Sequence, residues 1–409
     1  MRDLVLLLTD RCNLCCSYCW QEGRSSRQEM TWDVARTALE LLLCSPRAPR
    51  LLVLSGGEPL LAGDLFRRCV ELARARFPSP ADLRIAASTN GTLFGDHLVR
   101  FLAANDVALQ VSYDGAGQEQ RAPGTAPAVA AALRRLGELE PEWFGRRVRV
   151  ALTLTPATLP LLASSIASIL GLGVRDVAVA AVTAAEWPPG PALESELDRQ
   201  LERIVAAWRD LGPEAGASPV SLLREPASRS LPAEDAAWCR AAVPESVAVD
   251  PGGAVWGCPS AASSMQRLSP AVVPISEALF LGDVRDPDLP SRLAALPVRA
   301  RSARALTHRR GKRSELAECG TCEHLLTCSP CALAAARVPG GADPDLVPTI
   351  TCALSRASAR ARATLPRRPS PLSLLIRIES LTGALRKPGR QPVEADLLRQ
   401  PAPNRGARE

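Results

Sequence analysis

Apolar residues fall into short runs along the first half of the chain, and the segments between these runs are longer and amphipathic. The runs are rich in Val, Leu and Ala and nearly continuous in hydrophobicity, which is typical of buried parallel strands. They predict six strands, at residues 4–9, 51–55, 84–88, 108–113, 148–155 and 176–182. The segments between them predict five helices, at residues 31–43, 64–76, 95–103, 126–138 and 159–170.

Six strand–helix units in succession predict an α/β fold whose parallel sheet curves into a partial (β/α)6 TIM-like barrel. A further helix is expected at residues 193–211. Thr31 and Asp64 stand at the start of two helices and are candidate N-caps. In such folds functional groups lie at the C-terminal ends of the strands, so the residues that follow each strand are the candidates for function.

The chain changes character after the last of these helices. Residues 212–235 are rich in Pro, Ser and Ala and indicate a linker. Beyond them, Asp250-Pro251-Gly252-Gly253 supplies a turn between short apolar runs at 247–249 and 254–256, which predicts a hairpin. We therefore expect four parts: a barrel at 1–211, the linker at 212–235, a cysteine-rich domain at 236–355, and a basic Arg/Pro-rich tail at 356–409.

Positive charge is concentrated in the tail, where residues 356–409 hold 12 Arg and Lys against 4 Asp and Glu. We expect this tail to be largely disordered, apart from a short amphipathic helix near residues 371–385. The whole chain has a net charge of +6, so the remainder is about −2. This balance, without a helix-turn-helix or zinc-finger motif, argues against nucleic acid as a partner.

The 13 cysteines are too many to be ordinary core residues. No signal peptide is expected, because the apolar run at 4–8 ends at once in Thr9, Asp10 and Arg11. No stretch approaches the ~20 apolar residues that a membrane helix needs. We therefore expect a cytoplasmic protein with no membrane partner, and cysteines in that reducing compartment indicate metal ligands rather than disulfides.

Three cysteines follow the first predicted strand in the spacing C-x3-C-x2-C: Cys12, Cys16 and Cys19. Three thiolates on one loop can hold three irons of a 4Fe–4S cube and leave the fourth iron open to a cofactor or substrate. A structural zinc site is the alternative, but zinc sites favour four ligands in paired C-x2-C spacing. Cys15 lies inside the motif but off its spacing, so we expect no ligand role for it.

This motif and three later ones resemble the radical S-adenosylmethionine (SAM) superfamily. The cysteine loop, with Tyr18 before its last cysteine, is similar to the superfamily's cluster-binding loop. Further similar motifs follow in the superfamily's order: Gly56-Gly57-Glu58-Pro59, Thr89-Asn90-Gly91 and Ser112-Tyr113-Asp114-Gly115. Each is weak alone, but their order and their position at strand ends together favour the resemblance.

The resemblance implies a cofactor-binding role for six residues: Gly56, Gly57, Glu58, Asn90, Ser112 and Arg121. The two glycines would let the backbone approach a ligand closely, and the glutamate would accept from the amino group of SAM. Asn90 and Ser112 would hydrogen-bond its carboxylate or ribose. Arg121 would pair with the carboxylate, but it follows the preceding motif at a short spacing, and a surface arginine is the alternative.

A second group of seven cysteines lies towards the C-terminus: Cys239, Cys258, Cys319, Cys322, Cys328, Cys331 and Cys352. Seven ligands exceed one tetrahedral site. Only five residues separate Cys322 from Cys328, whereas a zinc ribbon needs a loop of ~15–20 residues there. The count fits one four-cysteine and one three-cysteine iron–sulfur cluster.

This second group resembles the SPASM domain, the C-terminal auxiliary-cluster module of many radical SAM peptide maturases. The run that begins at Cys319 has the spacing C-x2-C-x5-C-x2-C, where the family's last interval is x3. The resemblance divides the ligands between two auxiliary clusters: Cys239, Cys258 and Cys331 for the first, and Cys319, Cys322, Cys328 and Cys352 for the second.

The resemblance implies an enzyme that reductively cleaves SAM to a 5′-deoxyadenosyl radical, which then abstracts hydrogen from a substrate. The expected result is oxidation of a peptide or protein side chain, with an electron donor such as flavodoxin or ferredoxin. A radical SAM dehydrogenase or rearrangement enzyme acting on a small molecule is the alternative. A non-enzymatic iron–sulfur carrier is disfavoured, because it has no need of the glycine and polar motifs at the strand ends.

One branch of the superfamily fits the sequence less well. Sulfatase-maturating enzymes carry an Asp directly after the cysteine that corresponds to Cys258, whereas Pro259 follows it here. Sulfatase maturation is therefore less favoured than other peptide modification, and the sequence names no catalytic acid or base.

Overall fold

The computed structural model of the protein describes the following residues: 3–19, 21, 27–44, 50–210, 218–224, 246–262, 273–294, 311–324, 328, 330–338 and 343–365. Cys239 and the helix expected near residues 371–385 lie outside the described residues. Most of the expected linker at 212–235 does as well.

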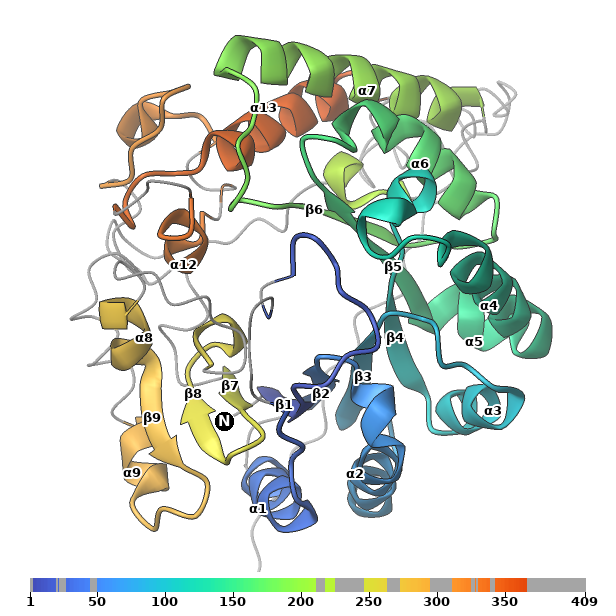
Figure 1. The fold of residues 1–409 in the computed structure, drawn as a ribbon, viewed down its shortest axis with the longest axis vertical. Helices are drawn as coiled ribbons and strands as arrows, with labels where there is room; N and C mark the ends of the chain where they lie inside the picture. The colour runs from blue at the N-terminus through green and yellow to red at the C-terminus, as the bar shows by residue number, and fades with distance from the viewer. Residues whose placement is uncertain are drawn as a thin grey trace, which may run out of the picture. The chain divides into compact units, whose positions relative to one another are not determined.

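Nine strands form a single sheet in the order β6-β5-β4-β3-β2-β1-β7-β8-β9 (Figure 1). Six consecutive strands are parallel: β1 (Asp3–Thr9), β2 (Arg50–Gly56), β3 (Leu83–Thr89), β4 (Val107–Ser112), β5 (Val148–Leu154) and β6 (Val177–Ala181). The predicted strands and the partial barrel are confirmed. The barrel does not close, because β1 pairs with β7 rather than with β6.

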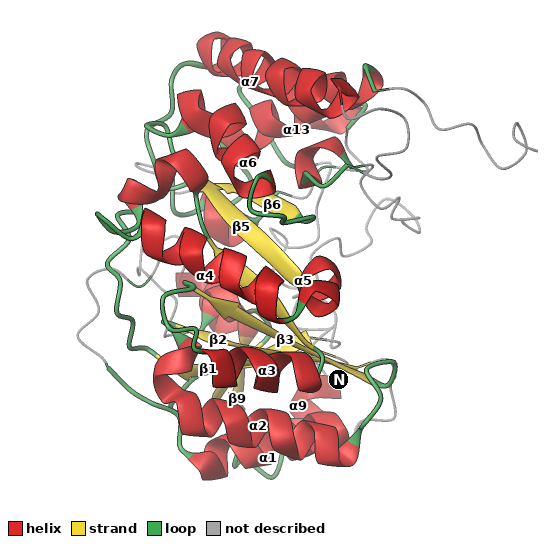
Figure 2. Ribbon diagram, turned by 90° about the vertical axis from the view of Figure 1, so that its right-hand side faces the viewer, coloured by secondary structure: helices red, strands yellow, loops and turns green. Residues whose placement is uncertain are grey.

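Helices cover one face of the parallel strands (Figure 2). They are α1 (Trp32–Leu43), α2 (Gly63–Arg76), α3 (Asp96–Ala104), α4 (Ala126–Leu139), α5 (Pro141–Arg147) and α6 (Leu162–Leu170). Thr31 caps α1 as predicted, since its hydroxyl accepts from the Val34 N–H at 3.4 Å. Asp64 is not an N-cap, because α2 begins one residue earlier. Helix α5 was not predicted; its buried Trp143 donates to the Val107 carbonyl at 3.0 Å.

Burial alternates along β2, β3, β4 and β5, although their sequences are almost continuously apolar, whereas β1 is buried along nearly its whole length. In β3, Leu83, Ile85 and Ala87 are buried, whereas Arg84 is exposed and Ser88 is half-buried. The expectation that the strands are buried on both faces therefore holds for β1 and is wrong for β2 to β5. An open barrel leaves its inner face only partly covered, and small and polar residues line that face.

The sheet continues beyond the six predicted strands. β7 (Ser246–Val249) pairs in parallel with β1, and the predicted hairpin joins it to β8 (Ala254–Trp256). The turn is closed by Asp250, whose carboxylate accepts from the backbone N–H groups two and four residues ahead. A strand that was not predicted, β9 (Phe280–Asp283), pairs with β8. The sheet therefore runs past the boundary that we expected at residues 212–235.

Two long helices lie side by side at one end of the sheet in both views, α7 (Gly190–Asp210) and α13 (Thr349–Ala363). Helix α7 confirms the helix predicted at 193–211. Helix α13 runs past residue 356, where the tail was expected to begin. Among the described helices, none has the length and apolar character that crossing a membrane would require.

Candidate functional site

The loop at residues 10–19 crosses the C-terminal ends of the parallel strands. Asn13 Nδ2 donates to the Thr92 hydroxyl at 2.8 Å, just beyond β3. Ser17 donates to the carbonyl of Gln120, which ends the 3-10 helix Gly115–Gln120 that follows β4, through its N–H at 3.2 Å and its hydroxyl at 3.1 Å. The loop that carries the first cysteine motif is therefore fixed at the sheet edge where the fold predicts function.

The three predicted ligands differ in exposure: Cys12 is exposed, while Cys16 and Cys19 are half-buried. Burial raises the pKa of the Cys16 thiol to about 11, although the nearby Arg121 cation lowers it. Among the residues that the structure describes, no three Cys, His, Asp or Glu side chains converge closely enough to hold a metal ion. Iron binding would require the thiols to lose their protons, because thiolates are the ligands, and to draw together.

Gly56 and Gly57 bring the end of β2 against the start of this loop. Gly56 has a φ of 134°, and a Cβ there would lie 2.4 Å from the Thr9 carbonyl oxygen. A Cβ on Gly57 would lie 2.3 Å from the Arg11 carbonyl oxygen. The glycines were expected to make room for a ligand. In this structure they make room for the backbone of β1 and its loop.

We expect Gly57→Ala to destabilise the cysteine loop by about 1–3 kcal/mol, because its methyl group would collide with the backbone of Arg11. Iron content after anaerobic reconstitution should fall. Gly63→Ala is the matched control, since a Cβ at Gly63 meets no atom within 4 Å and its φ of −56° suits alanine. Equal iron content and equal melting temperature in both variants would contradict this role for Gly57.

Glu58 is wholly buried, with none of its surface exposed. Its carboxylate accepts from the Thr89 hydroxyl at 2.8 Å, from the Asn90 N–H at 2.6 Å and from the Leu60 N–H at 3.1 Å. Burial raises the pKa of Glu58, and these three donors lower it. Glu58, which was expected to accept from the amino group of SAM, thus joins the ends of β2 and β3 through its hydrogen bonds.

Asn90 and Ser112 lie at the same edge as the cysteine loop. Asn90 Nδ2 donates to the Asn13 side-chain oxygen at 2.8 Å and approaches the Cys12 sulfur at 3.8 Å. Its own side-chain oxygen accepts from Thr92. Ser112 is the last residue of β4 and half-buried, and its hydroxyl makes no hydrogen bond to another residue that the structure describes. The polar groups of Asn90 are thus used within the chain, whereas the Ser112 hydroxyl remains available to a ligand.

Arg121 is buried, with 6% of its surface exposed, so the alternative of a surface arginine is wrong. Its Nη2 donates to Asp114 Oδ1 at 2.8 Å, to the Thr153 hydroxyl at 3.1 Å and to the Ala151 carbonyl at 3.2 Å. Burial lowers the pKa of Arg121, but the carboxylate of Asp114 and the Tyr18 phenol raise it by more. The cation expected to pair with SAM is therefore already paired within the chain.

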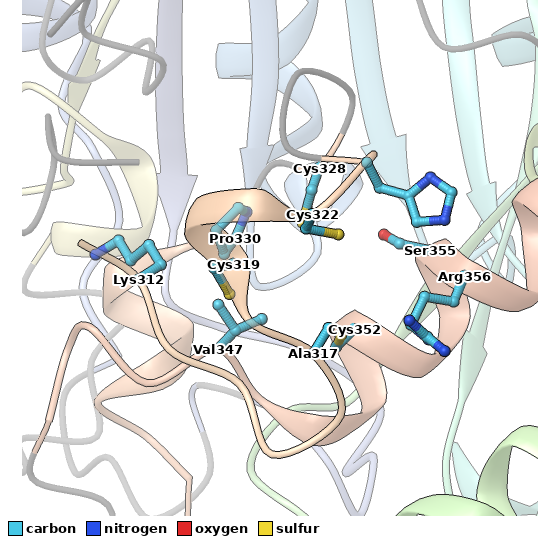
Figure 3. Close-up of a pocket in the computed structure, with 11 residues that line it drawn as sticks. Lys312, Ala317, Cys319, Cys322, Cys328, Pro330, Val347, Cys352, Ser355 and Arg356 are labelled. Carbon is cyan, nitrogen blue, oxygen red and sulfur yellow. The ribbon is translucent and has the colours of Figure 1, made fainter. Parts of the chain in front are cut away.

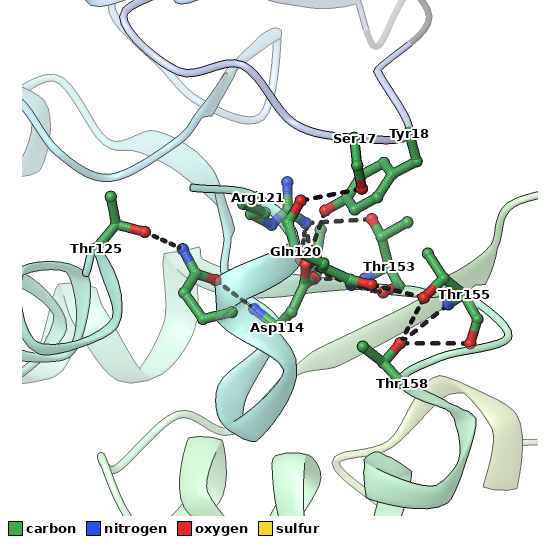
Figure 4. Close-up of polar contacts among 11 residues, drawn as sticks. Ser17, Tyr18, Asp114, Gln120, Arg121, Thr125, Thr153, Thr155 and Thr158 are labelled. Carbon is green, nitrogen blue, oxygen red and sulfur yellow. Dashed lines mark hydrogen bonds and ion pairs between the residues drawn. The ribbon is translucent and has the colours of Figure 1, made fainter. Parts of the chain in front are cut away.

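Asp114 connects the cysteine loop to the ends of β4 and β5, and no role was predicted for it (Figure 4). It has 1% of its surface exposed. Oδ2 accepts from the Tyr18 hydroxyl at 2.7 Å and from Gln120 Nε2 at 2.9 Å, and Oδ1 accepts from Arg121 and from the Thr153 N–H at 2.7 Å. The sequence signal was its place as the acid of the Ser-Tyr-Asp-Gly motif.

Four cysteines of the second group line one pocket: Cys319, Cys322, Cys328 and Cys352 (Figure 3). Cys352 comes from α13, and the other three come from the segment that begins with the 3-10 turn at Cys319–Thr321. Burial raises the pKa values of Cys319 and Cys352. Cysteines from two parts of the chain thus line the same pocket, and four thiols are a donor set that suits an iron–sulfur cluster once they draw together around it.

Cys331 does not line this pocket. It packs with Cys258 against a separate small apolar cluster that includes Ile275 and Leu279. Cys331 directly precedes α12 (Ala332–Ala335), and Cys258 directly precedes the 3-10 turn at Pro259–Ala261. The described cysteines of the second group therefore separate into a set of four and a pair.

Residues 6–141 match a known family, since they fit the model of the Radical SAM superfamily. This part of the chain is therefore similar to a radical SAM domain. The solved structures extend the likeness over most of the chain. It aligns with anSMEcpe with bound AdoMet at a TM-score of 0.65 and 16% identity, covering 93% of this chain and 100% of that one. It aligns with Streptococcus suis SuiB bound to S-adenosylmethionine at a TM-score of 0.55 and 15% identity, covering 86% of this chain and 76% of that one.

Curated relatives match only the N-terminal part. The cysteine-type anaerobic sulfatase-maturating enzyme of Clostridium perfringens is 30% identical over 125 residues, which cover 28% of this chain and 34% of the relative. The AdoMet-dependent heme synthase of Methanosarcina barkeri is 38% identical over 115 residues, covering 27% and 31%. A probable GTP 3′,8-cyclase of Methanocaldococcus jannaschii is 25% identical over 166 residues, covering 41% and 51%. The chain thus spans about a third to a half of the length of these relatives.

Proposed function

We propose that the protein is a radical SAM enzyme that binds a catalytic 4Fe–4S cluster at Cys12, Cys16 and Cys19 and oxidatively modifies a peptide or protein side chain. One observation carries the proposal. The loop with the three cysteines is hydrogen-bonded to residues beyond β3 and β4, so the matching motifs meet at one edge of the sheet. A bound cluster and SAM supply a carbon-centred radical there, which can take hydrogen from an unactivated carbon.

The residues of the chain position this chemistry. Asn90 lies beside the Cys12 sulfur, where its N–H favours the thiolate form. Ser112 offers a hydroxyl to SAM at the end of β4. We infer that Glu58 and the two glycines before it act on the cofactor indirectly, by holding the ends of β1, β2 and β3 together. Arg121 would also act on the cofactor indirectly, because it pairs with Asp114, which accepts from Tyr18 of the cysteine loop.

The C-terminal cysteines would hold two auxiliary clusters within a domain at residues 236–355. The pocket of four cysteines supports the second of these, and the Cys258–Cys331 pair supports the first. Cys239 would complete the first set. An electron donor such as flavodoxin or ferredoxin would supply the reducing electron to the N-terminal site.

The peptide class of substrate is supported by the shared fold. Structures exist of anSMEcpe with bound AdoMet and Cp18Cys peptide and of SuiB bound to its precursor peptide SuiA, at TM-scores of 0.65 and 0.55 to this chain. Pro259 opens a 3-10 turn after Cys258, so no carboxylate stands there as in sulfatase maturases. The heme synthase and GTP cyclase among the relatives favour a small-molecule substrate as the second candidate.

Metal and product analysis of the anaerobically reconstituted full chain tests the proposal. We expect about twelve irons with matching sulfide per chain, for three clusters. Addition of dithionite and SAM should release methionine and 5′-deoxyadenosine. Zinc in place of iron, or about four irons only, would overturn the auxiliary clusters. Bound iron without any SAM cleavage would overturn the proposal that the protein is a radical SAM enzyme.

A further inference from the structure

The pocket of four cysteines is lined by two cationic side chains, Lys312 and Arg356 (Figure 3). Lys312 has 4% of its surface exposed, and the Arg356 side chain has 32% exposed. They come from different segments, since Lys312 precedes the cysteine run and Arg356 lies one turn after Cys352 on α13.

Each cation is held by a carboxylate that does not itself line the pocket. Lys312 Nζ donates to Asp345 Oδ1 at 2.6 Å and to the Pro344 carbonyl at 3.0 Å. Arg356 Nε donates to Glu194 Oε1 at 2.9 Å, which ties α13 to α7. The side chains of both cations line the pocket, whereas neither acid does.

Both cations line the same pocket as the four thiols. Cys352 and Arg356 lie one turn apart on α13, which places their side chains on the same face of the helix. Cations in the pocket wall favour negative charge there, and a partly buried site screens this attraction less than open solvent does.

We propose that Lys312 and Arg356 set the reduction potential of the cluster held by Cys319, Cys322, Cys328 and Cys352, and raise it. This inference rests on the proposed function. A cluster with four thiolate ligands carries net negative charge and gains one more unit on one-electron reduction. Fixed cations beside it therefore stabilise the reduced form, because the attraction grows with that charge. Such a site is suited to accept an electron rather than to release one at low potential.

A redox titration with dithionite, followed by electron paramagnetic resonance on the reconstituted full chain, tests this. The relevant signal is the one that Cys352→Ser removes or alters. We expect Arg356→Gln to lower its midpoint potential, with roughly tenfold less reduced cluster at a fixed potential, or ~59 mV for a one-electron couple. Lys312→Met should act in the same direction. Arg356→Lys keeps the charge and should stay close to wild type.

Arg360→Gln is the matched control. Arg360 lies one turn further along α13 and pairs with Glu194 at 3.2 Å and Asp198 at 2.9 Å, but it does not line the pocket. Arg360→Gln weakens the same contact between α7 and α13. The midpoint potential of the cluster should nevertheless stay unchanged in this variant.

The outcomes separate two failures. If the Cys352→Ser signal is present in the wild type, but Arg356→Gln and Lys312→Met leave its potential unchanged, the inference about the cations is wrong. The same holds if Arg360→Gln shifts it as much as Arg356→Gln. If Cys352→Ser removes no signal and no iron, no cluster is bound there. In that case the auxiliary-cluster part of the proposed function fails first.

Discussion

Replacing Cys12, Cys16 and Cys19 together with alanine is expected to lower the iron content from about twelve to about eight per chain and to abolish SAM cleavage. The three thiols are the only ligands that the loop offers in the C-x3-C-x2-C spacing, and the cluster cannot bind SAM without them. The C-terminal cysteines belong to other segments of the chain, so their iron should remain. Iron and sulfide analysis and 5′-deoxyadenosine release measure both effects.

Cys15→Ala is the control within the same loop. Cys15 is exposed and lies beside Cys16 but off the spacing of the motif, so its loss should leave iron content and SAM cleavage unchanged. If Cys15→Ala and the triple variant lose the same iron, the ligand set named here is wrong. If the triple variant keeps SAM cleavage, the N-terminal loop is not the catalytic site.

The sequence was sufficient to predict the barrel, because six strands with near-continuous hydrophobicity alternate with amphipathic helices. It could not reveal that the sheet continues through β7. That pairing joins residues near 4 to residues near 247, and no local pattern encodes such a long-range register. The strand β9 has only four residues, and α5 has seven, so both are too short for a periodic signal.

The candidate site shows the same division between local and long-range information. Spacing and motif order placed the cysteines and the strand-end residues correctly at one edge. They could not tell which polar groups meet a ligand and which meet each other. Glu58 and Arg121 are both buried among donors and acceptors from the chain, and only the packing of several strand ends reveals it. The partner of Cys331 could likewise be seen only in three dimensions.

Asp114→Asn is expected to destabilise the protein by about 3–5 kcal/mol, the cost of leaving one member of a buried ion pair without its partner. The substitution keeps the shape but removes the charge opposite Arg121, which has 7% of its side chain exposed. The new amide N–H group would also face donors, either from Tyr18 and Gln120 or from Arg121 and Thr153. Chemical or thermal unfolding of the full chain measures the change.

Asp106→Asn separates this effect from the general loss of an Asp–Arg pair. Asp106 pairs with Arg147 at 2.5 Å, with side chains 20% and 29% exposed, and it lies away from the cysteine loop. Its φ of 47° is one that asparagine tolerates, so we expect a loss of about 1 kcal/mol or less. Asp114→Asn should in addition lower the iron held by the N-terminal loop, because Tyr18, between Cys16 and Cys19, then faces either an amide N–H group or a weaker acceptor than a carboxylate. Equal stability and equal iron in the two variants would mean that Asp114 does not hold the loop. A stability loss with full iron content would mean that Asp114 stabilises the fold without positioning the loop. Other contacts, such as those of Asn13 and Ser17, would then position it.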